Sequence, residues 1–166
     1  MTTFYIEENP PLAKTSSHEL DAPPWLRVEA TLMSLSRDIR RAYDLRLQEL
    51  GLNLSEASTL AYTQESGPLM QADLARHLGI GRAAMGSLVD SLEQLELVER
   101  RPKPGDRRVW LVAVTPSGGE VVRQVLKIDE KLRAELRAGI SRKERRELAQ
   151  LLNRLRENMG RVFLED

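Results

Sequence analysis

The chain has 166 residues, and its 25 Lys and Arg residues balance 25 Asp and Glu residues, so the formal net charge is zero. A zero net charge gives no argument for a polyanionic partner, and any basic surface must be local. The absence of cysteine excludes disulfides, thiolate nucleophiles, cysteine redox switches and cysteine-based metal sites. Two histidines, His18 and His77, leave little for a metal site, so we expect neither a metal nor a cofactor.

The length and the N-terminal composition predict one folding unit preceded by an arm. A chain of this length can bury one substantial core. Residues 1–24 hold four prolines among small polar residues, which is typical of an arm that is loose or docks elsewhere. The N-terminus lacks a basic start followed by an apolar run, and no later run approaches the ~20 apolar residues of a membrane span. We therefore expect a cytoplasmic protein without a membrane partner.

Apolar residues at helical spacing predict a long first helix and a shorter second one. Asn53 or Ser55 can cap the second helix, which runs to about Gln64. The first helix extends from Trp25 to near Gly51, and its length exceeds what a small core needs to cover. Its apolar residues recur in steps of three and four, at Val28, Leu32, Leu35, Ile39, Tyr43 and Leu47.

Two further helices follow, separated by a short glycine turn. The third runs from about Gln71 to Leu78 with Gly79 as its terminator, and the fourth runs from Gly81 to about Leu95. Helix, short turn and helix is the spacing of a helix-turn-helix. The stripe expected to be buried on the fourth helix is Met85, Leu88, Val89, Leu92 and Leu95.

The same turn fits a dinucleotide-binding fingerprint, Gly79-x-Gly81-x-x-Ala84. That motif needs a buried strand before the glycines and a βαβ pattern around them. Residues 73–78 have helical periodicity and too little β-branching for such a strand. We therefore reject the nucleotide-binding interpretation, and the glycines are expected to end one helix and start the next.

Residues 97–118, LVERRPKPGDRRVWLVAVTPSG, predict a hairpin with a basic tip. Two prolines and a glycine at 102–105 break the chain between a strand at 97–101 and a strand at 109–115. Thr115 then caps a fifth helix that ends near Ala138. Ser141 and Glu144 match a capping box that opens a sixth amphipathic helix reaching Val162.

The segment DLARHLGIGRAAMGSLVDSLEQLELVERRPKPGDRRVWLVAVTPSG resembles the MarR (multiple antibiotic resistance regulator) family of transcription factors. The family pattern runs roughly L-A-x-x-L-G, L-V-D-x-L-E, L-V-x-R, D-R-R and L-T-P-x-G, and the resemblance extends less specifically over residues 25–162. Met70 and Glu96 depart from it, where the family commonly has a Thr N-cap and a Gly. The matching residues fall in register without gaps: Leu74-Ala75, Leu78-Gly79, Leu88-Val89-Asp90, Leu92-Glu93, Leu97-Val98, Arg100, Asp106-Arg107-Arg108, Val114-Thr115-Pro116 and Gly118.

The resemblance implies that the helix from Gly81 enters the DNA major groove. Arg82 is then the best base or phosphate contact, and Ser87 can donate to either. Ala83, Ala84 and Gly86 stand where many members carry Ser or Thr, and Ser87 stands where many carry Arg. Direct readout is therefore expected to be sparse and to depend on methyl contacts and DNA shape. For Ala84, simple helix packing is an equally good interpretation.

The resemblance also implies that the hairpin lies along the minor groove as a wing. Its Arg100, Arg101, Lys103, Arg107 and Arg108 stand against two acidic residues, Glu99 and Asp106, a local excess of three positive charges. We assign Arg107 or Arg108 to insertion into the minor groove and Asp106 to its support. The alternative is a solvated charged turn. Arg76 and His77 are candidates for backbone contacts, although a lone histidine on a helix is more often a surface or cap residue.

MarR-like proteins are dimers that respond to small effectors, and this implies roles for the terminal helices. Helices at about 25–50 and 116–162 are expected to form a homodimer that reads a pseudo-palindromic operator. A small aromatic or anionic effector is expected between these helices and the DNA-binding lobe, with Trp25, Arg40 and Tyr43 as candidate pocket residues. The alternative for these residues is ordinary packing.

The sequence thus predicts a mainly α fold with residues 25–166 as a single domain. Its winged helix-turn-helix covers about 53–115, with a two-stranded wing and long terminal dimerisation helices. The expected function is a DNA-binding transcriptional regulator, a homodimeric repressor released by an effector. The alternative is a winged-helix module that binds a protein partner. An enzyme is not expected. The two histidines look structurally unrelated, and the sequence offers no catalytic triad, phosphate loop or metal-ligand cluster around them.

Overall fold

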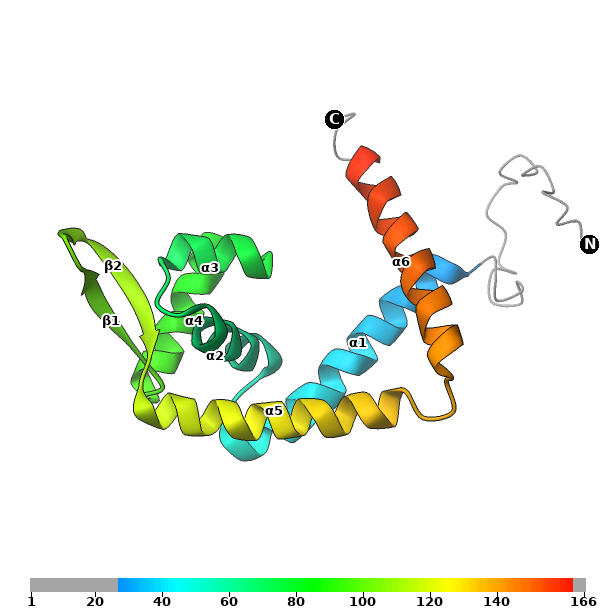
Figure 1. Ribbon diagram of the computed structural model, residues 1–166, viewed down its shortest axis with the longest axis horizontal. Coiled ribbons are helices and arrows are strands. Elements are labelled where there is room, and N and C mark those ends of the chain that lie inside the picture. The colour runs from blue at the N-terminus through cyan, green and yellow to red at the C-terminus, as the bar shows by residue number, and fades with distance from the viewer. Residues whose placement is uncertain (1–26, 163–166) are drawn as a thin grey trace, which may run out of the picture. The chain divides into compact units, whose positions relative to one another are not determined.

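The computed structural model describes residues 27–162, so the predicted arm at 1–24 and Trp25 lie outside the described residues. By its internal contacts the chain divides into two units, residues 1–39 and residues 40–166. The first helix, α1, spans this boundary, and all the elements after it belong to the second unit (Figure 1). The described elements are α1 (Val28–Leu47), the 3-10 helix η3 (Gln48–Leu50), α2 (Leu54–Ser66), α3 (Gln71–Leu78), α4 (Arg82–Gln94), β1 (Val98–Lys103), β2 (Asp106–Val114), α5 (Pro116–Leu136) and α6 (Arg142–Val162).

The mainly α fold with a two-stranded antiparallel hairpin after α4 is confirmed. Local caps explain several helix starts. Asn53, rather than Ser55, caps α2, and its side chain and that of Glu56 bond each other's backbone N–H groups at 3.0 and 2.9 Å. Thr115 caps α5 by accepting a hydrogen bond from the Gly118 N–H at 3.0 Å. The predicted capping box between Ser141 and Glu144 is also present.

The helix ends differ from the predicted positions by up to one turn. The first helix was predicted to end near Gly51; α1 itself ends at Leu47, and the 3-10 helix η3 continues to Leu50 with Gly51 as its C-cap. Gly51 adopts φ 69°, and its N–H bonds the carbonyl of Gln48, which tightens the last turn. Conversely, α2 extends to Ser66, two residues beyond the predicted end. The third helix has the predicted bounds.

The hairpin is longer and its loop tighter than predicted. Pro102 pairs with Trp110, so β1 continues to Lys103, and β2 already begins at Asp106. The prediction that residues 102–105 all lie in the break was therefore wrong. Pro102 is tolerated because β1 has a partner on only one side, and a proline lacking its N–H is compatible with such an edge strand.

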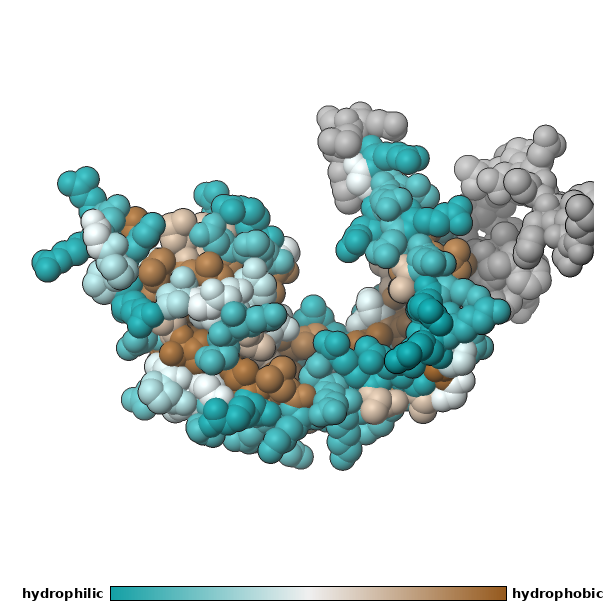
Figure 2. Space-filling view, viewed as in Figure 1, coloured by the Kyte–Doolittle hydropathy of each residue, from teal (hydrophilic) through white to brown (hydrophobic). Residues whose placement is uncertain are grey.

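The buried core of the second unit gathers around α2, which packs against α3, α4, α5 and β2. The predicted stripe on α4 is only partly buried, since Leu95 is 46% exposed at the end of the helix. Figure 2 shows apolar residues gathered over the body of this unit, while the outer end of the hairpin is hydrophilic. The core includes Leu47, Leu60, Leu74, Met85, Val89, Leu92, Val98, Val112 and Val122, and these side chains hold the helix-turn-helix and the root of the hairpin together.

Two stretches of helix leave apolar side chains exposed. Described by itself, the first part of α1 exposes Val28, Met33 and Leu35. No residue of α6 is buried. Among residues 27–162, no helix combines the length and apolar character needed to cross a membrane. The exposed apolar residues of α6 are Leu148, Leu151, Leu152, Met159 and Val162.

Candidate nucleic-acid interface

The first turns of α4 present a small and exposed surface. Arg82, Ala83, Ala84 and Ser87 are exposed, while the opposite side of the helix, with Met85, is buried. The Ser87 hydroxyl donates to the Ala83 carbonyl at 3.4 Å. No side chain caps the N-terminus of α4, so its first N–H groups are available to an anion. Small side chains beside such an N-terminus allow the backbone to approach a ligand closely.

Gly86 lies on a different side of α4 from this surface. It is half-buried, and a Cβ added to it would meet Nε2 of Gln71 at 3.3 Å. The glycine therefore allows α4 and the start of α3 to pack closely. Of the five recognition-helix residues predicted from the sequence, four share the exposed surface, and Gly86 lies at the contact between the two helices.

The outer part of the hairpin carries four exposed cations, on Arg101, Lys103, Arg107 and Arg108. Within the described part of the chain, none of the four forms an ion pair. The Asp106 carboxylate instead accepts a hydrogen bond from the backbone N–H of Arg108 at 3.1 Å. Asp106 thus supports the turn and forms no ion pair with these four cations.

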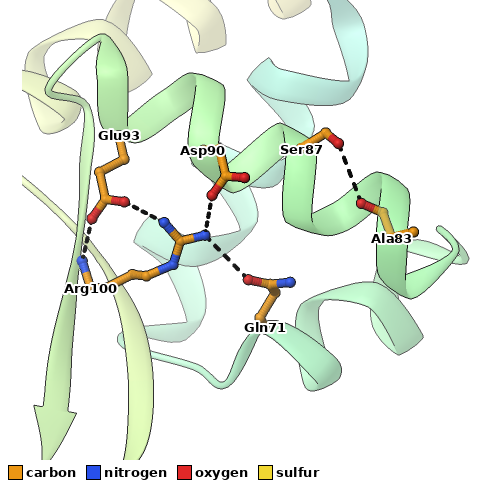
Figure 3. A network of polar contacts seen from close by, with 6 residues as sticks. All are labelled: Gln71, Ala83, Ser87, Asp90, Glu93 and Arg100. Carbon is orange, nitrogen blue, oxygen red and sulfur yellow. Dashed lines mark hydrogen bonds and ion pairs between the residues drawn. The ribbon is translucent and has the colours of Figure 1, made fainter.

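Arg100, predicted to belong to the same basic group, lies at the root of the hairpin. Its guanidinium lies between two carboxylates of α4 and the amide of Gln71 on α3 (Figure 3). It bonds Asp90 at 2.5 Å and also Glu93, and Glu93 accepts the backbone N–H of Arg100 at 3.1 Å. Burial acts to lower the pKa of Arg100, but the bonds to Asp90 and Glu93 outweigh it and raise the pKa. Arg100 therefore links the wing to the recognition helix.

Arg76 and His77 lie at the other end of α3 and already have neighbours. Arg76 forms an ion pair with Asp73 at 3.1 Å and remains exposed. The ring of His77 lies 5.3 Å from the ring of Tyr62 on α2. Met70, at the start of α3, makes no side-chain capping bond, as its departure from the family pattern predicts.

Sequence reasoning missed the connection from α2 to the last turn of α4. The Glu56 side chain is buried, and besides the Asn53 N–H it accepts a hydrogen bond from the Ser91 hydroxyl at 2.7 Å. The Asn-x-x-Glu spacing at 53–56 signals the capping half of this arrangement. Nothing local to the sequence signals the contact with Ser91, which lies 35 residues away.

The candidate effector residues Arg40 and Tyr43 line separate cavities. Arg40 lies 3.4 Å from the Ser55 hydroxyl, beside an open cavity of about 590 Å³ that also reaches Ala84 and Ser87. Tyr43 lines a cavity of about 370 Å³ between α1, α2 and α5. There its hydroxyl donates to Asp129 at 2.7 Å. Burial and this bond raise the pKa of Tyr43, while Arg133 acts in the opposite direction.

The fold and the charges define a winged helix-turn-helix protein that binds DNA. An exposed helix N-terminus follows a short turn, and a hairpin with uncompensated positive charge follows that helix. The MarR family profile matches residues 50–109. YdgJ of Bacillus subtilis, an uncharacterised HTH-type transcriptional regulator, is 32% identical over 112 residues, which cover 68% of each chain.

The chain belongs to the MarR family, whose members are DNA-binding transcriptional regulators and not enzymes. Two solved structures have the same fold. MepR of Staphylococcus aureus, solved in complex with DNA, has a TM-score of 0.72 and 22% identity, covering 78% of this chain and 96% of that one. BpsR of Bordetella bronchiseptica, whose DNA binding is regulated by 6-hydroxynicotinic acid, has a TM-score of 0.69 and 20% identity, covering 78% and 98%.

Proposed function

We propose that the protein is a homodimeric repressor that reads a pseudo-palindromic operator with α4 in the major groove and the hairpin in the adjacent minor groove. The observation that carries this proposal is the set of four exposed cations on the hairpin, none of which is paired within the described chain. An uncompensated cation neutralises a phosphate without first giving up a protein partner, and Arg favours the negative potential of a narrow minor groove. Repression follows from the resemblance, and a role on chromosomal DNA agrees with the expected cytoplasmic location.

The surface of α4 supports a specific kind of readout. Arg82 is its one charged side chain near the N-terminus, and Ala83, Ala84 and Ser87 carry few donors. We therefore expect a closely docked helix with few hydrogen bonds to bases, and specificity that depends on thymine methyl contacts and groove width.

The exposed apolar residues of α6 and of the first part of α1 support the homodimer. Apolar side chains repeated along one helix are costly to leave in water, and a second copy of the same chain would cover those of each helix by two-fold symmetry. Two recognition helices would then read two half-sites at a fixed spacing.

The cavity beside Arg40 supports the effector part of the proposal. An anionic effector paired with Arg40 would also contact Ala84 and Ser87, so it would meet the recognition helix directly. It would favour a geometry in which α4 no longer fits the groove. We expect 6-hydroxynicotinic acid or benzoate to weaken DNA binding. This loss of affinity on adding the effector should be reduced more by Arg40→Ala than by Tyr43→Phe. An equal response in the Arg40 variant would contradict the assignment.

DNA binding is tested with a duplex that the protein itself selects in vitro from a random-sequence pool. Fluorescence anisotropy at several salt concentrations gives the affinity and its salt slope. We expect tight binding whose slope falls by up to about two in Arg107→Ala/Arg108→Ala, because two phosphate or groove contacts are lost. The control Arg123→Ala/Lys127→Ala removes two cations from α5 and should keep the slope.

Failure to select any duplex would overturn the DNA-binding proposal in favour of a protein partner. That alternative has two observations in its favour, the zero net charge of the chain and the small side chains on α4. A partner interaction that is insensitive to salt would support it. Equal salt slopes in the hairpin variant and the wild type would instead overturn the assignment of the wing.

A further inference from the structure

The hairpin has two faces with different surroundings. Residues directly opposite each other in an antiparallel pair share a face, and alternate residues along a strand do so too. The register pairs Arg100 with Val112 and Pro102 with Trp110, so these four side chains lie on one face. Val112 is buried in the core, and Arg100 reaches Asp90 and Glu93 on α4. This face of the hairpin therefore looks toward the recognition helix.

Trp110 is the exposed apolar residue of that face. It is 57% exposed, and its cross-strand neighbour Pro102 is exposed as well. Tryptophan carries a large apolar surface, and at this position more than half of it is left in water. Exposed cations lie close to it along the chain: Arg108 is two residues before Trp110, and Arg101 and Lys103 flank Pro102 on the other strand. An aromatic ring among unpaired cations has the chemistry of a nucleic-acid contact.

The geometry of duplex DNA says which part of the nucleic acid would meet this face. The major and minor grooves of a duplex are separated by one sugar–phosphate strand. If α4 occupies one groove and the outer end of the hairpin occupies the next, the sugar–phosphate strand between the grooves must pass the hairpin face that looks toward α4. Trp110 and Pro102 lie on this face, between the root held by Arg100 and the tip.

We propose that Trp110 contacts the sugar–phosphate backbone between the two grooves and thereby positions the wing on DNA. The proposal rests on the DNA-binding function proposed above. The face of the indole covers a deoxyribose ring, and the indole N–H donates to a phosphate oxygen. The contact is not ionic and releases no counterion, so it adds affinity without adding to the salt dependence.

The test measures binding of the same selected duplex to the wild type, Trp110→Ala and Trp110→Phe. We expect DNA to change the tryptophan emission of the wild type and not that of Trp110→Phe, which retains Trp25 as its only tryptophan. We expect Trp110→Ala to lose about tenfold in affinity at an unchanged salt slope. Trp110→Phe should recover most of that loss, because the ring still covers the sugar.

The proposal is overturned by wild-type affinity in Trp110→Ala, by a reduced salt slope in that variant, or by DNA binding without a change in Trp110 emission. An emission change that follows protein concentration without DNA in the wild type, and that is absent in Trp110→Phe, would identify a second copy of the chain as the occupant and would also overturn it. Failure of the wild type to bind DNA is distinct, because it removes the proposed function itself. Circular dichroism checks the fold of each variant, and Trp110→Phe keeps the test decisive if the alanine variant unfolds.

Discussion

At the scale of single residues, the joint between α4 and the hairpin depends on a few backbone positions. Glu96 adopts φ 57°, in the left-handed region that favours glycine, at the position where the family commonly has glycine. Its carbonyl accepts hydrogen bonds from the hydroxyls of Thr115 and Ser117 at 2.7 and 2.8 Å. These two bonds to the start of α5 stabilise an otherwise unfavourable turn, and so fix where the hairpin leaves the helix.

Gly118 is also part of this joint, because the place that a Cβ would occupy is already filled by neighbouring backbone and side-chain atoms. A Cβ at this position would lie 2.0 Å from the Leu97 carbonyl oxygen and 2.8 Å from a methyl of Val114. We predict that Gly118→Ala lowers the free energy of unfolding by about 1–3 kcal/mol, because backbone must shift to admit the methyl group. Denaturant unfolding measures the change.

The neighbouring glycine provides a matched control for this prediction. A Cβ at Gly119 would meet nothing closer than the Gln64 side chain at 4.0 Å. Gly119→Ala should therefore raise stability by roughly 0.5–1 kcal/mol, the usual gain of alanine over glycine within a helix. Equal effects of the two substitutions would contradict the assigned role of the Gly118 contact.

At the scale of elements, the Arg100 contacts orient the hairpin relative to the recognition helix. One guanidinium bonds carboxylates on successive turns of α4, and the backbone N–H of the same residue bonds Glu93. A hairpin that moved independently of α4 would lose conformational entropy when it became ordered on DNA. A hairpin tied to α4 is already oriented, so less of the binding free energy is spent on ordering it.

Replacing Arg100 should show whether this residue positions the hairpin or contacts DNA phosphates directly. We predict that Arg100→Ala lowers stability by about 0.5–1 kcal/mol, because Asp90 and Glu93 are 60% and 39% exposed and solvent screens the lost ion pairs. It should also weaken DNA binding while leaving the salt slope unchanged. Thermal unfolding and anisotropy against salt concentration give the two quantities.

Arg101 is the natural comparison, because it is exposed and unpaired in the described chain. Arg101→Ala should leave stability unchanged and reduce the salt slope by about one. If Arg100→Ala reduced the slope as Arg101→Ala does, Arg100 would be a phosphate contact and not a positioning residue.

Elements with local signals could be predicted from the sequence, and contacts between distant residues could not. Helix α3 has its predicted bounds because apolar spacing and Gly79 define both ends. The basic tip of the hairpin follows from composition. The partners of Arg100 depend on how the hairpin folds back on α4, and the separation of Arg40 from Tyr43 depends on the packing of α2. Neither leaves a pattern in a single sequence.

For the whole molecule, a zero net charge is compatible with DNA binding because unpaired cations are concentrated on the hairpin. Some cations elsewhere pair with acidic neighbours, as Arg46 does with Glu135 and Arg133 with Asp129, whereas none of the four clustered on the hairpin does so within the described residues. The long-range field is therefore weak and the local potential at the wing is positive. We infer that one hairpin alone gives modest affinity, which makes two copies per site important.

The exposed apolar residues of α6 lead to the prediction that joins assembly to DNA binding. Leu151 is 54% exposed on a helix without buried residues, so a charge there should spare the folded core and disrupt an interface. We predict that Leu151→Glu converts a dimer to a monomer in light scattering, since burying an unpaired carboxylate in an apolar interface is unfavourable. Leu95→Glu places the same charge at a similarly exposed position after α4, and should remain dimeric.

The same variant should then bind a single half-site as the wild type does and lose affinity only for the duplex with two half-sites. Two linked modules gain from the high effective concentration of the second one, and that gain vanishes when the link is cut. A dimeric Leu151→Glu protein would show that α6 does not form the interface. A monomer with full affinity for the complete duplex would show that two-fold symmetry is not how this protein reads DNA.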